Sequence, residues 1–263
     1  MEIVSNIYEN GKGIITFNGN LTKVAAKAFT DCTSLETITL PESVTALGNM
    51  AFYGCSSLTD IDMPDTITSI GYAAFRHCNL KSFTIPSSLT SVDDAIFADC
   101  INLAEFKGKF ASEDGRCLIV DGVLKSFAHF GVTEYTLPGS ITKIGDEAFC
   151  CDSNLASVTI PDGVTEIGDY AFYWCQGLTS ITIPDSVTSI GVGAFKLCYD
   201  LTSVFCERTT PPTANFEGYS SWGAFYRNAA DRKIYVPTES VDAYKTADGW
   251  KDYADAIEPY DFE

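Results

Sequence analysis

The sequence lacks long apolar segments and clusters of basic residues. No stretch approaches the ~18 consecutive apolar residues of a membrane helix, so we expect no membrane insertion by this segment. The chain has 17 Lys and Arg against 35 Asp and Glu, a formal net charge of -18. Because this charge repels a phosphate backbone, we expect no nucleic-acid partner. The first residues, Met1–Asn6, lack a basic segment followed by an apolar one, so no signal peptide is predicted in this sequence.

Residues that serve catalysis and metal binding are also scarce. The sequence has only 2 histidines, His77 and His129, and no H-E-x-x-H, G-x-S-x-G or glycine-rich phosphate motif. No C-x-x-C or mixed Cys/His pair has the spacing of a zinc site. Several carboxylates follow repeated prolines; stacked carboxylates can bind a cation, but turn capping is the simpler interpretation. The sequence therefore predicts no enzyme, no metal site and no cofactor.

What the sequence does contain is an internal repeat of about 23 residues. Phenylalanines recur at this spacing, and alanine precedes all but one of them. A leucine, a proline and a glycine recur in register with them in most repeats. We call each set of equivalent positions a column. The phenylalanine column consists of Phe29, Phe52, Phe75, Phe97, Phe149, Phe172 and Phe195.

One repeat shows how the pattern folds. Ile61 and Met63 are two residues apart, so both point to one side of a short strand, which Pro64 ends. Gly71 permits a tight bend, and Tyr72–Phe75 has the length of one helical turn. One repeat cannot bury its own apolar side. Stacked repeats share a continuous core, with strands in a parallel sheet at ~4.8 Å spacing.

The ends and the middle of the stack depart from this pattern. Ile15–Asn18 is predicted to form the first strand, and Phe225 marks a divergent last turn. Apolar residues between Val241 and Ile257 predict a C-terminal helical cap that is broken near Gly249. Between Phe97 and Phe149, two apolar runs flank Asp121–Gly122, which is a strong signal for a β-hairpin.

These patterns resemble the BspA-like class of bacterial leucine-rich repeats. The resemblance rests on T-S-I-T-I-P-D-S-V-T-S-I-G-x-G-A-F at Thr179–Phe195 and its copies, on the central S-E-D-G-R-C-L-I-V-D-G-V-L, and on K-I-Y-V-P-T-E-S-V-D-A-Y near the end. With the repeat, it implies an α/β leucine-rich repeat solenoid with a parallel strand face and short helical turns on the back. A mid-chain β-hairpin insertion and the C-terminal helical cap complete the predicted fold.

We expect a single leucine-rich repeat domain over residues 1–263. Its predicted parts are an N-terminal cap strand (1–20), a first repeat block (21–106), a hairpin insertion (107–134), a second repeat block (135–206), and a divergent last turn with a helical cap (207–263).

The resemblance also implies a location and a role. Such proteins are secreted or lipid-anchored at the bacterial surface and attach to host proteins or other cells. We therefore expect a monomeric, extracellular adhesion module that binds a host extracellular or bacterial surface protein or glycan. The alternative is a structural spacer or stalk with no partner of its own.

Two surfaces are candidates for partner binding. The first is the outward side of the predicted strands, which is rich in hydroxyl groups and comprises Thr37, Thr39, Asp60, Asp62, Ser82, Thr84, Ser157, Thr159, Ser180, Thr182, Ser203 and Phe205. The alternative is that these residues have no binding role, because serine and threonine are also common on strands that face solvent. The second consists of the aromatic residues Tyr219, Trp222 and Tyr226 before the last turn, which alternatively pack under the C-terminal cap.

Most of the 10 cysteines belong to the repeat. Those that lie three residues after a column phenylalanine are Cys32, Cys55, Cys78, Cys100, Cys175 and Cys198. Asn228 takes this place in the last turn, and Cys150–Cys151 fall outside the column. One small residue per layer predicts a ladder of buried free thiols. Stacked cysteines can also come close enough for disulfides, and metal binding is the remaining alternative.

Overall fold

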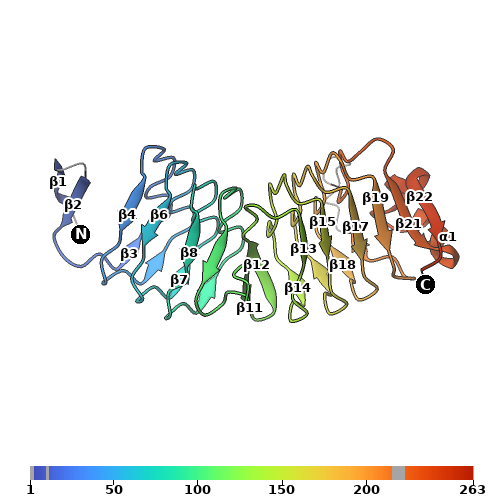
Figure 1. Cartoon of the computed structure of the whole chain (residues 1–263), viewed down its shortest axis with the longest axis horizontal. Coiled ribbons are helices and arrows are strands. Elements are labelled where there is room, and N and C mark those ends of the chain that lie inside the picture. Colours follow the sequence, from blue (N-terminus) through green and yellow to red (C-terminus); the bar gives the residue numbers. More distant parts are fainter. Residues whose placement is uncertain (1–2, 10–11, 215–222, 263) are drawn as a thin grey trace.

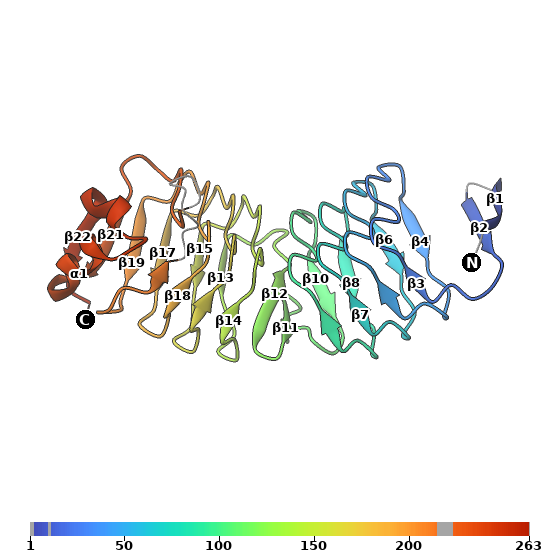
Figure 2. The ribbon, with the colours of Figure 1, turned by 180° about the vertical axis from the view of Figure 1, so that it is seen from behind.

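The computed structural model describes residues 3–9, 12–214 and 223–262. The chain winds into an elongated stack of coils that runs from the β1–β2 end to the α1 end (Figures 1 and 2). Each repeat forms one coil with three sides: a strand face, a second strand row and a turn face. Among the described residues the only α-helix is α1, and no helix is long and apolar enough to cross a membrane.

The strand face contains the strands that the sequence predicts and one further strand at its C-terminal end. Its members are β4 (Thr37–Thr39), β6 (Asp60–Asp62), β8 (Ser82–Thr84), β10 (Glu105–Lys107), β13 (Glu134–Thr136), β15 (Ser157–Thr159), β17 (Ser180–Ile183), β19 (Ser203–Cys206), β21 (Lys233–Pro237) and β22 (Ile257–Tyr260). Paired neighbours are parallel and in the register of the repeat, as in Ile38 beside Ile61. The alternation of Ile181 inward and Thr182 outward separates the core from the surface.

A second row of short strands forms another side of the coil. It comprises β3 (Lys23–Val24), β5 (Ala46–Leu47), β7 (Ser69–Ile70), β9 (Ser91–Val92), β14 (Lys143–Ile144), β16 (Glu166–Ile167), β18 (Ser189–Ile190) and β20 (Thr213–Ala214). Each has one inward apolar residue, such as Ile167, which pairs with Ile190 of the next coil. These two-residue strands were not predicted, because one inward residue shows no alternation.

The turn face differs from the short helical turns that the sequence predicted. Ala74 donates its N–H to Gly71 O and Arg76 donates to Ala73 O, each at 3.2 Å, as in tight turns, but the N–H groups that alternate with them bond to the following coil. The N–H of Phe75 donates to Ile96 O of the following coil at 2.9 Å. Positive φ angles at Ala73 (52°) and His77 (60°) break any helix. Bonding between coils therefore replaces bonding along a helix.

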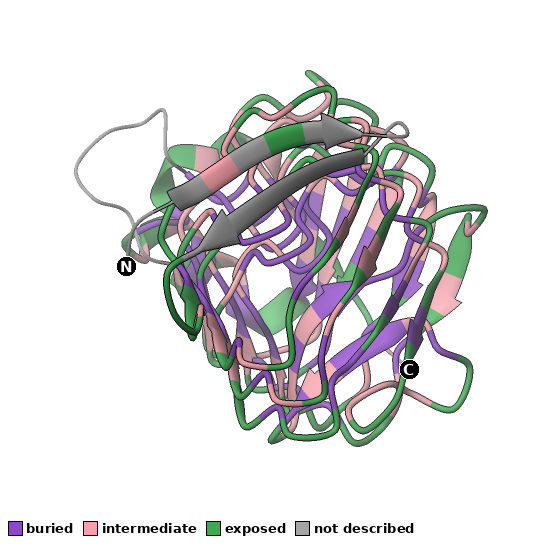
Figure 3. Ribbon diagram, turned by 90° about the vertical axis from the view of Figure 1, so that its left-hand side faces the viewer, coloured by how far each residue is buried: buried purple, intermediate pink, exposed green. Residues whose placement is uncertain are grey.

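The core is a ladder of stacked rings inside the coils. Phe29 and Phe52 stack with centroids 5.1 Å apart, and Phe149 and Phe172 with centroids 4.7 Å apart. The leucines and isoleucines of the columns surround these rings, and most of them are buried. Seen along the stack, buried segments line the inside of the coils and exposed segments the outside (Figure 3).

An antiparallel hairpin lies in the middle of the stack. β11 (Cys117–Val120) and β12 (Val123–Phe127) pair across Asp121 and Gly122, whose φ angles are 50° and 78°. β12 also pairs in parallel with β14. Its Phe127 packs against Phe149 at 4.9 Å, so the hairpin fills the place of a coil in the ring ladder.

Both ends of the chain differ from the repeat. β1 (Ile3–Glu9) pairs antiparallel with β2 (Lys12–Phe17) as a separate two-stranded sheet, so the strand predicted at residues 15–18 does not begin the stack. At the other end, η2 (Thr238–Ser240), α1 (Val241–Thr246) and η3 (Lys251–Ala256) form the predicted helical cap. The buried Tyr244 and Trp250 tie it to the last coil by donating to Arg208 O and Pro212 O, each at 2.8 Å.

The column glycines are required by close approach between coils. A Cβ added at Gly168 would lie 2.4 Å from Asp146 Oδ1 and 2.8 Å from Asp146 N of the preceding coil. Because that backbone is held by the stack, we expect Gly168→Ala to lower the free energy of unfolding by about 2–3 kcal/mol. At Gly139 an added Cβ meets nothing within 4 Å. Gly139→Ala is therefore the matched control in urea denaturation, and equal losses for both variants would contradict this explanation.

Candidate binding surfaces

The structure places the predicted strand-face residues on one outward surface. Thr37, Thr39, Asp60, Asp62, Thr84, Thr159 and Thr182 are exposed, and Ser82, Ser157, Ser180, Ser203 and Phe205 are partly buried. The parallel register lines them up across coils, as in Thr37 beside Asp60 and Thr182 beside Phe205. In the first coils this surface offers only hydroxyl and carboxylate groups. Toward the C-terminal end, aromatic side chains take the outward positions of the strands.

Four aromatic residues gather at the C-terminal end of the strand face. Phe205 and Tyr235 stack with centroids 4.8 Å apart, and Tyr260 meets them edge-on at 5.3 Å and 5.7 Å. Phe262 packs against Tyr260 at 4.8 Å. We call these four residues the aromatic cluster. The side chain of Tyr260 is 43% exposed, so the cluster is open to solvent.

The strand register creates this cluster. β19 places Phe205 beside Tyr235 of β21, and β22 pairs with β21 on its other side. Of these four residues, only Phe205 was predicted from the sequence. The alternation of inward Ile234 and Val236 could also have identified Tyr235 as outward. Tyr260 depends on β22, which has no place in the repeat pattern.

Hydrogen-bonding groups surround the aromatic cluster. Lys233 Nζ lies 2.7 Å from Glu258 Oε1, and this hydrogen bond lowers the pKa of Glu258 and raises the pKa of Lys233. Thr238 Oγ1 donates to Asp261 Oδ1 at 2.7 Å. An apolar centre with a polar rim is the composition found at protein interfaces.

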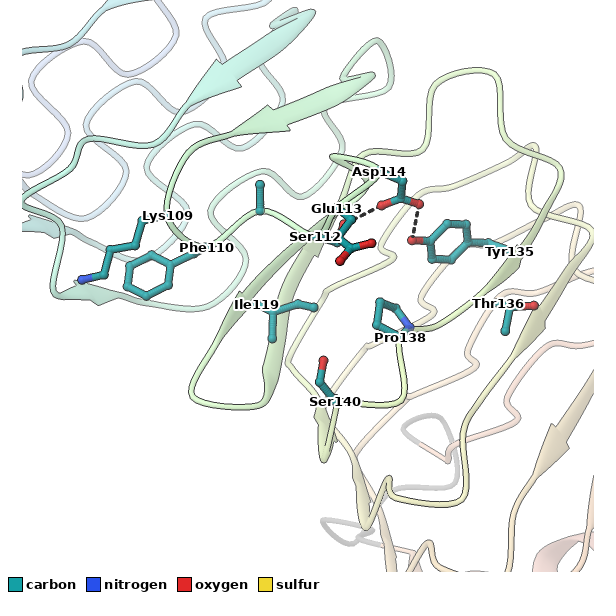
Figure 4. A pocket seen from close by; sticks show the side chains of 11 residues that line it. Lys109, Phe110, Ser112, Glu113, Asp114, Ile119, Tyr135, Thr136, Pro138 and Ser140 are labelled. Atoms are coloured by element: carbon teal, nitrogen blue, oxygen red, sulfur yellow. Dashed lines mark hydrogen bonds between the residues drawn. The ribbon is translucent and has the colours of Figure 1, made fainter.

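A cleft of about 590 Å³ interrupts the middle of the strand face (Figure 4). It lies beside the hairpin and is lined by Lys109, Phe110, Ala111, Ser112, Glu113, Asp114, Ile119, Tyr135, Thr136, Pro138 and Ser140. Asp114 accepts from Ser112 Oγ at 2.6 Å and from Tyr135 OH at 2.7 Å. Burial opposes ionisation, but these hydrogen bonds lower the pKa of Asp114. Its carboxylate is thus held in place by its neighbours.

The second predicted surface is only partly described. Tyr219 and Trp222 lie outside the described residues. Tyr226 is on the turn face, where Lys196 Nζ lies 5.6 Å and Arg227 Cζ 5.5 Å from its ring centroid. In the described part of this segment, Phe225 packs against the C-terminal cap, with the ring centroid of Trp250 at 5.8 Å.

The cysteine column has a structural role. All ten cysteines are free, as predicted. A column thiol donates to the carbonyl oxygen of the phenylalanine one coil earlier, as in Cys100 to Phe75 O and Cys198 to Phe172 O, each at 3.0 Å. Burial raises the pKa of Cys100 to about 12, so this thiol remains a donor. Among the described residues, no group of three or more His, Cys, Asp or Glu could hold a metal ion.

Comparisons with known proteins agree with this architecture. The family described as BspA type leucine rich repeat region matches residues 5–104 and 124–222 in 6 copies. No curated protein matches the chain.

Solved structures of bacterial leucine-rich repeat proteins share the fold. A leucine-rich repeat protein from Eubacterium ventriosum is 24% identical with a TM-score of 0.62, covering 82% of this chain and 63% of its own. A leucine rich cell surface protein from Faecalibacterium prausnitzii is 22% identical with a TM-score of 0.57. The match covers 79% of this chain and 63% of that protein. The pneumococcal vaccine antigen PcpA is 18% identical with a TM-score of 0.59. The match covers 91% of this chain and 69% of that protein. The chain thus spans 63% of the length of each of the first two proteins.

Proposed function

We propose, from the premise that this chain belongs to the BspA-type leucine-rich repeat family, that it is a non-enzymatic binding domain of a bacterial surface protein. Its ligand is a protein or glycan outside the cell. The surface location is supported by two structurally similar proteins, one a cell surface protein and the other a vaccine antigen. The observation that carries the binding role is the aromatic cluster.

The aromatic cluster favours binding over a role as a spacer. Tyrosine is enriched among the interface residues that contribute most to binding free energy. A stalk needs outward side chains that keep it soluble, and the threonines and aspartates of the first coils meet that need. Partly exposed rings that contact one another, such as Tyr235 and Tyr260, add nothing to such a role. A spacer with no partner is therefore the second candidate.

The test is binding to immobilised extracellular-matrix proteins, bacterial surface polysaccharides and whole cells. We expect saturable binding by residues 1–263 to one of these surfaces. Tyr235→Ala with Tyr260→Ala should raise the dissociation constant by about 30-fold or more, because a single hot-spot residue contributes about 2 kcal/mol. Thr37→Ala with Thr39→Ala, at the other end of the same face, should leave it within about twofold.

Two outcomes would contradict the proposal. Absence of saturable binding across the panel would favour the spacer. Equal binding by the tyrosine variant and the threonine variant would move the site away from the aromatic cluster. Circular dichroism and urea denaturation of both variants separate lost binding from lost folding.

A further inference from the structure

Two adjacent cysteines on the turn face are set apart from the cysteine column. Cys150 and Cys151 directly follow Phe149, and their Sγ atoms lie 3.2 Å apart. The column position in this coil, three residues after Phe149, is Asp152. The two thiols are therefore additional to the one residue that each coil uses to bond its neighbour.

The turn geometry brings these two side chains together. Adjacent residues in a strand point to opposite sides, but Cys151 has a φ of 67°. Trp174 and Leu197 occupy the same position in later coils, with φ of 60° and 64°. The rings of Tyr173 and Trp174 also approach each other, at 6.5 Å. The proximity of the two sulfurs thus follows from the coil itself.

The two thiols differ in their surroundings. Cys150 is buried against Ala95 and Ala98, whereas Cys151 is partly exposed. The hydrogen bond with Cys151, together with burial, raises the pKa of Cys150. The guanidinium of Arg76 interacts electrostatically with both sulfurs. Cys151 is therefore the sulfur that a reagent in solution meets first, and Cys150 the one behind it.

We propose that Cys150 and Cys151 form a vicinal dithiol that closes to a disulfide by exchange with a low-molecular-weight disulfide such as oxidised glutathione. The Cys151 thiolate attacks one sulfur of the reagent, forming a mixed disulfide and releasing one thiolate. Cys150 gives its proton to water and attacks Cys151 Sγ, which expels the second thiolate. The protein loses two electrons and two protons, and the reagent is reduced to two thiols.

The short distance between the two sulfurs and the exposure of Cys151 favour disulfide formation by this pair. A disulfide is about 2.0 Å long, so the two sulfurs need to approach by only about 1.2 Å. Column thiols such as Cys175 and Cys198 are buried, and each donates to a backbone carbonyl oxygen. Neither sulfur of that pair is open to a reagent in solution, whereas Cys151 is partly exposed and can take the first step.

The test uses the reduced, folded chain incubated with oxidised glutathione. We expect two of the ten thiols to be lost, with a mass decrease of two hydrogen atoms and no retained glutathione. Fragmentation spectra should place the bond between Cys150 and Cys151. Cys150→Ser should stop at a glutathione adduct on Cys151, and Cys151→Ser should keep all its remaining thiols. Cys175→Ser, a buried control, should still lose two.

Three results would overturn the proposal. They are an unchanged thiol count in the wild-type chain, a glutathione adduct that persists there, and a disulfide mapped to column residues such as Cys55 and Cys78. Circular dichroism of each variant before oxidation shows whether the coil is intact, so that failed folding is not read as lost reactivity.

Discussion

Replacing Phe172 with alanine should lower the free energy of unfolding by about 3–5 kcal/mol. The ring is fully buried and lies between Phe149 at 4.7 Å and Phe195 at 5.1 Å. Both neighbours belong to other coils that are fixed by backbone hydrogen bonds. The coils therefore cannot collapse into the space that the ring leaves. The loss includes the ring stacking itself, at about 0.5–1.5 kcal/mol for each pair.

The position of the ring in the stack provides the control. Phe29 lies in the first coil, is partly exposed and stacks on Phe52 at 5.1 Å. Phe29→Ala should cost about half as much as Phe172→Ala or less. Because contacts in a repeat stack are between neighbours, Phe172→Ala should also reduce cooperativity and lower the m-value in urea. Equal destabilisation by both variants would show that the ring ladder does not determine stability.

The columns made the coil predictable from the sequence. The spacing of Phe149, Phe172 and Phe195 gave the length of a coil, and Pro184 gave the end of its strand. Asp121–Gly122 gave the hairpin, because few other dipeptides adopt two successive positive φ angles. Each of these signals is local. Each either recurs in several repeats or belongs to residue types that favour one backbone conformation.

Features that depend on contact between coils were not predictable in this way. Tyr72–Phe75 has the composition of a helical turn, but the N–H groups of Tyr72, Ala73 and Phe75 bond to the next coil. The glycine column has a similar basis: Gly71 was predicted to permit a bend, and its column is restricted by the backbone of the preceding coil. β1 and β22 lie outside the repeat, so no column marked them.

The candidate site was predictable only in part. The outward residues of the strands, including Phe205, followed from alternation within each repeat. Tyr260 joins Phe205 through β22, and the cleft near Tyr135 depends on how residues 108–116 fold beside the hairpin. Both arise where the repeat is interrupted. Interruptions of the pattern were therefore the positions where sequence analysis was least informative about the site.

A buried ionisable pair at the hairpin was likewise not predictable from the repeat pattern. Asp152 takes the cysteine position in its coil, and His129 follows the hairpin strand β12. Both are buried, and His129 Nδ1 lies 3.5 Å from Asp152 Oδ1. On its other side, His129 Nε2 lies 3.0 Å from Cys100 O, which can only accept, so Nε2 carries a hydrogen. The pair thus links the coils on either side of the hairpin.

Asp152→Ala should lower the free energy of unfolding by about 2–3 kcal/mol. Asp152 Oδ1 accepts from the backbone N–H groups of Asn154 and Leu155, each at 3.2 Å. Alanine leaves both backbone donors without this acceptor, at about 1–3 kcal/mol for each buried unpaired group, and removes the carboxylate that lies beside His129. Asp152 Oδ2 is buried with no hydrogen-bond partner among the described residues, and its removal offsets part of the loss.

Urea denaturation of two further variants tests which part of Asp152 matters. Asp152→Asn keeps an oxygen for the two backbone donors, so it should lose about 1 kcal/mol if those bonds dominate. A loss as large as that of Asp152→Ala would instead assign the effect to the charge facing His129. Asp162→Ala, at an exposed turn, should stay within about 0.5 kcal/mol of the wild-type chain. If Asp152→Ala is no less stable than Asp162→Ala, the two halves of the stack are held together without this pair.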